Sequence, residues 1–131
     1  MILYLAGRYG RREELAIYAH RLRNRGHIVT SRWLDLTYPE DPIDIKTRCE
    51  LADRDLEDLR AAEVLISFTE PSDSVYGRGG RHVEFGIALA LGKTLHVVGH
   101  RENVFCCMDR IIFWNDVEDL ICYSRLWPGG R

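Results

Sequence analysis

The 131-residue sequence lacks several features that would restrict its function at once. It has no basic excess, because 18 Lys and Arg residues face 20 Asp and Glu residues and the net charge is −2. This balance argues against a dedicated surface for nucleic acids. No apolar run approaches the roughly 18 residues that a membrane-spanning helix needs. The segment Met1–Gly7 has no basic region, so we expect a first strand there rather than a signal peptide.

Cysteine and histidine are too few and too scattered to suggest a metal site or a disulfide framework. The cysteines are Cys49, Cys106, Cys107 and Cys122. They show no ligand-like spacing, and a disulfide between the two adjacent cysteines would be strained. None of the five histidines lies at a ligand-like spacing from another His or Cys on a common helix face. We therefore expect free thiols in a reducing cytoplasm and no metal site. We expect no organic cofactor either.

No complete nucleotide-binding motif is present either. Gly86 and the segment Gly92–Thr94 nearly match a phosphate loop, but five residues separate the glycines where four are needed. They also lie where a helix enters a strand, which reverses the required order. Gly7 and Gly10 follow a predicted strand but lack the three-glycine dinucleotide fingerprint. The sequence therefore indicates neither ATP nor NAD.

What the sequence does contain is an alternation of short apolar runs and amphipathic segments. With 46% hydrophobic and 29% charged residues, its composition is typical of a soluble globular domain. The predicted strands are Ile2–Leu5, His27–Ser31, Val64–Phe68, Thr94–Val98 and Ile111–Trp114. The predicted helices are Arg11–Arg25, Asp44–Ala62, Val83–Leu91 and Asp116–Leu126.

This alternation predicts a single α/β domain over residues 1–131. We expect a doubly wound, mainly parallel five-stranded sheet of the flavodoxin-like or Rossmann-like kind, with helices on both faces. Ligands of such folds bind beyond the carboxyl ends of the strands, which here are the loops after Leu5, Phe68 and Val98. The first of these loops supplies Gly7, Arg8 and Tyr9 as candidate substrate-binding residues.

Glu84 is the most unusual residue at this rim. It is the only charged side chain in the segment Val83–Leu91, which is otherwise apolar nearly all the way round. A helix of that kind should be buried, and ionised carboxylates are rarely buried without a charged or hydrogen-bonding partner or a functional role. Glu84 is therefore a candidate catalytic residue.

A glycine-rich basic loop precedes this helix. Its members are Gly77, Arg78, Gly79, Gly80 and Arg81. A loop at this rim that carries two arginines and leads into the N–H groups of a helix start favours contact with an anion over a mere connection. Arg8, Arg11 and Arg12 would add to the positive charge, although a solvated helix face explains Arg11 and Arg12 equally well.

The predicted helix Asp44–Ala62 carries three candidate acids. At about 100° per residue, Asp53 and Asp55 flank opposite edges of its apolar stripe, whereas Asp58 points well away from it. The periodicity does not choose between Asp53 and Asp55. Tyr4, taken alone, is more often a core aromatic residue than a catalytic one.

Four segments in this order resemble the nucleoside 2-deoxyribosyltransferase family, including the 2′-deoxynucleoside 5′-phosphate N-hydrolases and the short related proteins of bacteria and phages. They are Tyr4–Gly7, Asp53–Leu56, Ala62–Ile66 and His82–Lys93. The similarity runs from Ile2 to about Trp114. The helix that holds Glu84 and ends in Gly-Lys is fairly specific, and the other segments are individually weak.

The resemblance implies catalytic roles for three of these residues. Glu84 matches the nucleophilic glutamate of the family, and Asp55 matches the aspartate that assists it. Tyr4 matches a tyrosine that orients the glutamate. Retaining glycosidases also use a carboxylate to trap the sugar, so this chemistry suits the N-glycosidic bond of a 2′-deoxynucleoside.

The resemblance also implies substrate contacts outside the catalytic group. Ser72 falls where the hydrolase has a serine that contacts phosphate, and Cys106 falls where it has another. The segment that contains Cys106 and Met108 resembles one that reaches into the site of a neighbouring subunit. We therefore expect a homodimer or higher homo-oligomer with a shared active site. The loop before Glu84 is longer than in the hydrolase, and a thiol at Cys106 donates poorly to phosphate.

The expected activity is hydrolysis of 2′-deoxynucleoside 5′-monophosphates to the free base and deoxyribose 5-phosphate, a preference that rests on the arginines near Glu84. The first alternative is a transferase that exchanges bases between unphosphorylated deoxynucleosides. An alternative of another class is a nucleotide-binding sensor without turnover, against which the intact set of Tyr4, Asp55 and Glu84 argues. In each case the partner is a small molecule, not a nucleic acid or a membrane.

Overall fold

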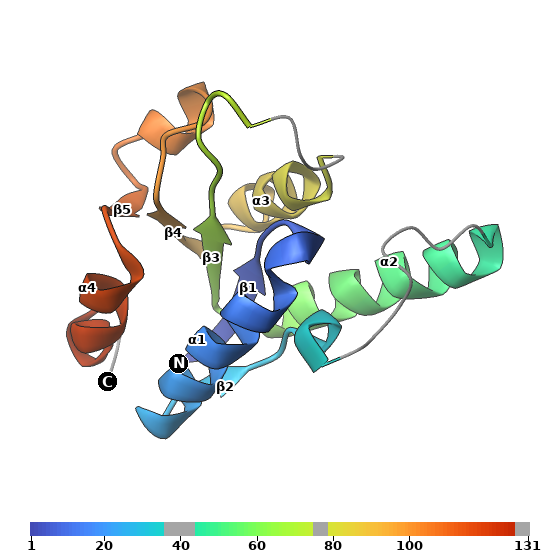
Figure 1. Ribbon diagram of the computed structural model, residues 1–131, viewed down its shortest axis with the longest axis horizontal. Helices are drawn as coiled ribbons and strands as arrows, with labels where there is room; N and C mark the ends of the chain where they lie inside the picture. The colour runs from blue at the N-terminus through green and yellow to red at the C-terminus, as the bar shows by residue number, and fades with distance from the viewer. Residues whose placement is uncertain (36–43, 75–78, 128–131) are drawn as a thin grey trace.

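The computed structural model describes residues 1–35, 44–74 and 79–127, and contains one five-stranded sheet in the order β2-β1-β3-β4-β5 (Figure 1). All of its strand pairs in the described ranges are parallel. The strands are β1 Ile2–Ala6, β2 Ile28–Val29, β3 Val64–Phe68, β4 Thr94–Val98 and β5 Ile112–Trp114. The predicted doubly wound parallel sheet is therefore confirmed.

Four α-helices and four short 3-10 helices connect these strands in the described ranges. The α-helices are α1 Arg12–Asn24, α2 Ile45–Ala61, α3 Gly80–Ala90 and α4 Val117–Cys122. The 3-10 helices are η1 Tyr9–Arg11, η2 Arg32–Asp35, η3 Val104–Cys107 and η4 Ser124–Leu126. Helix α1 packs on α4, and α2 packs on α3, so two helical layers enclose the sheet. No helix within the described ranges is both long and apolar enough to cross a membrane.

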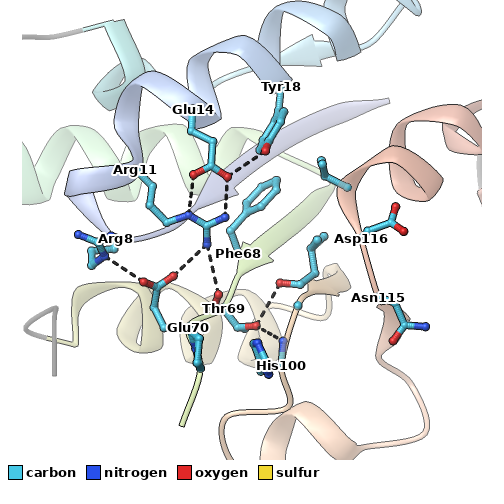
Figure 2. A pocket seen from close by; sticks show the side chains of 14 residues that line it. Arg8, Arg11, Glu14, Tyr18, Phe68, Thr69, Glu70, His100, Asn115 and Asp116 are labelled. Carbon is cyan, nitrogen blue, oxygen red and sulfur yellow. Dashed lines mark hydrogen bonds and ion pairs between the residues drawn. The ribbon is translucent and has the colours of Figure 1, made fainter. Parts of the chain in front are cut away.

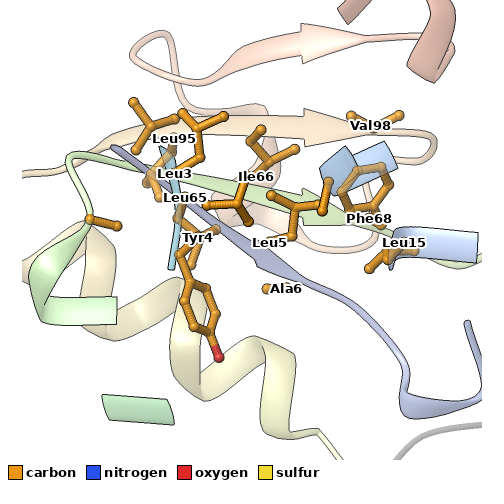
Figure 3. Close-up of a cluster of buried hydrophobic side chains, with 14 of the residues drawn as sticks. Leu3, Tyr4, Leu5, Ala6, Leu15, Leu65, Ile66, Phe68, Leu95 and Val98 are labelled. Carbon is orange, nitrogen blue, oxygen red and sulfur yellow. The ribbon is translucent and has the colours of Figure 1, made fainter. Parts of the chain in front are cut away.

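The core lies on the central strands, as their continuous apolar runs predict. Every residue of β3 is buried, and so are the last four residues of β1 (Figure 3). Leu15 and Leu22 of α1 fill one side of this core, and Gly7 lets the chain pass closely over it, because a Cβ at Gly7 would lie 2.7 Å from a methyl carbon of Leu15. The predicted bounds of β3 and β4 coincide with those in the structure.

Strand β2 is shorter than the predicted His27–Ser31. At its carboxyl end the hydroxyl of Ser31 accepts the backbone N–H of Leu5 at 2.7 Å. A side chain therefore replaces the backbone acceptor that a longer strand would offer to β1. Because a side chain takes this hydrogen bond, the backbone pairing between β1 and β2 ends early. The periodicity of apolar residues does not reveal such a substitution.

Helix α2 departs from its predicted packing. The apolar stripe predicted along it is exposed at Ile45, Cys49 and Ala52, because the first turns of α2 extend past the sheet (Figure 1). Asp58, which was predicted to point well away from this stripe, is buried instead. Its carboxylate accepts the backbone N–H of Arg32 at 3.0 Å and the Nε of the same arginine at 2.8 Å.

Helix α3 is also less buried than its apolar sequence predicts. Phe85 and Ala88 face the core, whereas Val83 and Leu91 are exposed. The prediction of a helix buried on all sides is therefore wrong for one face. Helix α3 packs on α2 and on the central strands, and Val83 lies on the side of the helix that faces away from them.

Candidate active site

The strand order changes direction between β1 and β3, which are hydrogen-bonded neighbours. From β1 the chain crosses over α1 to β2 on one side, and from β3 it crosses over α3 to β4 on the other. The loops that follow these two strands therefore diverge, and such a switch point is where doubly wound sheets bind their ligands. Two groups of polar side chains lie around it.

The first group joins β1 to α3. Tyr4 lies in the middle of β1, and its ring projects toward α3 (Figure 3). Its hydroxyl donates a hydrogen bond to Oε2 of Glu84, which lies in the second turn of α3. The structure thus brings together two residues that are 80 positions apart in the sequence, as the resemblance implies.

Burial controls the ionisation of this group. Loss of hydration raises the pKa of Glu84 to about 7, the charge of Asp55 acts in the same direction, and the hydrogen bond from Tyr4 opposes both. Burial also raises the pKa of Asp55 to about 6, with a further contribution from Asp58. The pKa of Tyr4 is raised by burial and by the charges of Glu84 and Asp55, so its phenol keeps its proton and acts as a donor.

The structure also separates the two acids that periodicity left equivalent. Asp55 is half-buried and its charge acts on Glu84, whereas Asp53 is exposed to solvent. The difference arises because α2 packs against α3 through the side of the helix that carries Asp55. Asp55, and not Asp53, is therefore the candidate acid of α2 that acts on Glu84.

The second group is an ion-pair network that links the loop after β1 to the loop after β3 (Figure 2). Arg8 donates through Nε to Oε1 of Glu70 at 3.0 Å, and Arg11 donates through Nη1 to Oε2 at 2.9 Å. Arg11 also donates to both carboxylate oxygens of Glu14 and to the carbonyl oxygen of Thr69. Arg8 was predicted to bind substrate, and here it holds a carboxylate of its own chain.

A cleft of about 420 Å³ opens beside this network, on the side of the sheet covered by α1 and α4 (Figure 2). Arg11, Glu70, Phe68 and His100 are among the residues that line it. The rings of Tyr18 and Phe68 stack with centroids 5.6 Å apart. Neither Tyr4 nor Glu84 lines this cleft.

The basic loop before α3 lies partly outside the described residues, since Gly77 and Arg78 are not among them. Gly79 has a φ of 89°, a left-handed value that favours glycine, and α3 begins at Gly80. Arg81 forms a bidentate ion pair with Glu102, and both side chains are largely buried. The arginine of this loop that is described is therefore already bound to a carboxylate.

The remaining predicted substrate contacts are more dispersed. Ser72 is exposed in the turn after β3, and Tyr9 lies in η1 with its ring 6.5 Å from that of Trp33. Cys106 is buried in η3, while Met108 just after it is exposed. Among the described residues, η3 makes no hydrogen bond to Tyr4, Asp55 or Glu84 within the same chain.

Sequence reasoning missed Glu70 and Glu102, the two acids that bind the predicted arginines. One signal was available for Glu70, because it follows a central strand by two residues and so had to lie at the rim opposite Arg8. Across the parts of the chain that are described, no group of three or more His, Cys, Asp or Glu side chains is arranged to hold a metal ion.

Comparisons with known proteins give a likeness in structure. No family model matches the sequence, and no curated protein matches it either. Among solved structures, the fold is similar to that of a 2-deoxyribosyltransferase from the psychrotolerant bacterium Bacillus psychrosaccharolyticus, with a TM-score of 0.73 and 21% sequence identity. The match covers 94% of this chain and 92% of that one. The chain therefore has the fold of a 2-deoxyribosyltransferase, which is the fold that the sequence resemblance implied.

Proposed function

We propose that the protein cleaves the N-glycosidic bond of 2′-deoxynucleosides and transfers the 2-deoxyribosyl group to a second base. The observation that carries this proposal is the hydrogen bond from the buried phenol of Tyr4 to Glu84, beside the half-buried Asp55. The similar Bacillus protein is a 2-deoxyribosyltransferase, described as a biocatalyst for the synthesis of nucleosides. The same fold and this carboxylate group support the same class of reaction here.

In the proposed first step, a carboxylate oxygen of Glu84 bonds to the anomeric carbon while the bond from that carbon to the base nitrogen breaks. The bonding electrons leave with the base, which takes a proton from Asp55. Tyr4 donates its hydrogen bond to Glu84 and holds it in line. Deoxyribose has no 2′-hydroxyl, so its oxocarbenium-like transition state forms comparatively easily and a single carboxylate suffices to trap it.

In the second step, a nitrogen of the incoming base attacks the anomeric carbon and Glu84 leaves as a carboxylate. The proton of the incoming base returns to Asp55, which restores the starting state. Because burial raises the pKa of Asp55 to about 6, this carboxyl is suited to exchange a proton near neutral pH. No step requires a metal or an organic cofactor.

Hydrolysis of 2′-deoxynucleoside 5′-monophosphates is the second candidate. It replaces the incoming base with water, and the observation in its favour is Ser72, an exposed hydroxyl at the rim after β3. The arginines that made it the first expectation from the sequence support it less, because Arg8 and Arg81 are paired with Glu70 and Glu102. A sensor without turnover is disfavoured, since binding alone needs no pair of carboxyls with raised pKa values.

A homo-oligomer with a shared active site is part of the proposal. Ile45 on α2 and Val104 on η3 are each 75% exposed, and Phe105 beside Val104 is 56% exposed. Apolar side chains so exposed on projecting elements favour burial against another subunit. Size-exclusion chromatography with light scattering is expected to give at least twice the mass of one chain. The proposed setting is the cytoplasm, with a small-molecule substrate rather than a nucleic acid or a membrane.

The test is direct. The protein is incubated with a deoxynucleoside and a free base, and separately with a deoxynucleoside monophosphate in water, and the products are resolved by chromatography. A new deoxynucleoside in the first reaction supports the transferase, and deoxyribose 5-phosphate in the second supports the hydrolase. Glu84→Gln is expected to abolish either activity, and turnover retained by this variant would refute the assignment.

A further inference from the structure

The carboxylate of Glu70 occupies the position between two arginines at the switch point. Its two oxygens are divided between them, with Oε1 on Arg8 at 3.0 Å and Oε2 on Arg11 at 2.9 Å (Figure 2). The Glu70 side chain is only 9% exposed. Two guanidinium groups that converge on one carboxylate form the arrangement that also binds phosphate. Here the protein supplies the anion itself.

Both arginines of this network already hold carboxylates of the chain. Arg11 holds Glu14 at 2.7 Å in addition to Glu70. A phosphate monoester carries about −1.5 to −2 charges at neutral pH. To reach these guanidinium groups it would have to displace Glu70 and leave that carboxylate largely buried without a partner, which is costly.

The network lies at the carboxyl ends of β1 and β3, on the side of the sheet covered by α1. Arg8 follows β1 by two residues and Glu70 follows β3 by two residues, so their ion pair crosses the carboxyl rim between the two strands. Tyr4, which holds Glu84, lies on the same β1 four positions before Arg8. A substrate group that extended from Glu84 across this rim toward α1 would therefore meet the carboxylate of Glu70 together with the two arginines.

We propose that Glu70 is a specificity-determining residue, and that its carboxylate occupies the anion position between Arg8 and Arg11 so that unphosphorylated deoxynucleosides are preferred over their 5′-monophosphates. This inference rests on the proposed function for its substrate class. Glu70 acts as a built-in competitor for phosphate. Removal of its charge takes one carboxylate away from both arginines, which makes the position a site for an external anion.

The test compares Glu70→Gln with wild type and with a matched control, Glu118→Gln. Gln keeps the size of the side chain and removes its charge. Glu118 is a second carboxylate held by an arginine, Arg21 at 2.7 Å, so its variant changes the net charge equally at a distant ion pair. Binding of inorganic phosphate is measured by calorimetry, and kcat/KM is measured for a deoxynucleoside and for its 5′-monophosphate.

Glu70→Gln is expected to bind inorganic phosphate at least tenfold more tightly than wild type and Glu118→Gln. Its ratio of monophosphate to nucleoside kcat/KM should rise at least tenfold. Unchanged phosphate affinity and an unchanged ratio in Glu70→Gln would overturn the inference. A wild-type enzyme that prefers the monophosphate would overturn it too, whether or not the variant folds.

The phosphate titration needs no turnover, which separates this inference from the proposed function. Absence of base release from every substrate, together with a gain of phosphate binding in Glu70→Gln, would refute the proposed activity and support the anion position. Base release by wild type without any effect of Glu70→Gln would refute the role of Glu70 and support the activity. Glu70→Asp, which keeps the charge, is expected to keep phosphate excluded.

Discussion

The phenol of Tyr4 in the central strand β1 donates a hydrogen bond to the carboxylate of Glu84 on α3, 80 residues later in the chain. The Tyr4 side chain is fully buried, so its position is set by the packing of the sheet. The hydrogen bond from this fixed donor restricts the rotamers that the side chain of Glu84 can adopt. A reacting carboxylate held in one orientation before substrate arrives is the arrangement that the proposed reaction needs.

Tyr4→Phe is expected to raise the pKa of Glu84, because the phenol donates its hydrogen bond to the ionised carboxylate. The acidic limb of the kcat/KM profile should move to higher pH, since Glu84 must be ionised to react. A hydrogen bond to a charged group contributes about 1.5–3 kcal/mol, so kcat/KM at pH 7 should fall roughly tenfold to hundredfold. Tyr18→Phe removes a similar hydrogen bond to Glu14 and should leave the acidic limb in place.

Asp55→Asn is expected to remove the proton donor for the departing base. General acid catalysis typically contributes about 10²–10⁴-fold, so kcat should fall by that order with an ordinary base and much less with a base that leaves without protonation. Steady-state rates with both kinds of nucleoside check this. Asp53→Asn, an exposed aspartate on the same helix, is the matched control, and an equal loss in both variants would contradict the role of Asp55.

Glu84→Gln is expected to stabilise the protein at high pH. The pKa of Glu84 is raised to about 7 from an ordinary 4.5, so the folded state binds this proton more tightly than the unfolded state does. That contribution is fully present below pH 4.5 and is lost as the pH rises through 7. The variant has no charge to bury, so its free energy of unfolding at pH 8 should exceed that of wild type by about 1–3 kcal/mol. Urea unfolding at pH 8 and pH 4 measures the difference, which should vanish at pH 4.

His96→Gln is expected to reduce the sensitivity of the fold to acid. His96 is fully buried in β4, its Nδ1 accepts from Trp114, and burial lowers its pKa to about 4. The folded state thus favours the neutral ring, and stability falls as the pH drops from 6.5 toward 4. At pH 5 wild type should lose about 2 kcal/mol through this residue. Gln keeps an acceptor for Trp114, so thermal unfolding between pH 7.5 and pH 5 should shift less in the variant. The exposed His20→Gln should behave like wild type.

Most of the fold could be predicted from the sequence, because its central strands have continuous apolar runs. Strands such as Val64–Phe68 and Thr94–Val98 are buried on both faces, so their apolar runs are continuous and their bounds are sharp. Glycines with a positive φ, such as Gly92, mark the helix ends. The exposed start of α2 was not readable, because an apolar stripe at Ile45 and Cys49 looks the same in sequence whether the chain itself covers it or not.

The candidate catalytic group was partly readable. Glu84 stands out in the sequence as one charge in an apolar helix, and the resemblance points to Tyr4 and Asp55. Periodicity alone left Asp53 equivalent to Asp55, since both flank the same stripe. The packing of α2 against α3 distinguishes them, because it buries one edge of the helix and leaves the other in water.

The linear order of residues therefore determined the parallel sheet, its helical layers and the presence of an acid at the carboxyl rim, because each follows from the periodicity of apolar side chains over a few turns. Only the tertiary structure decided which charges are already neutralised. Arg8 and Arg11 meet Glu70 across about sixty positions of sequence, and Arg81 meets Glu102 across 21. The strength of an ion pair depends on the distance between the two charges in space, and short-range sequence patterns do not give that distance.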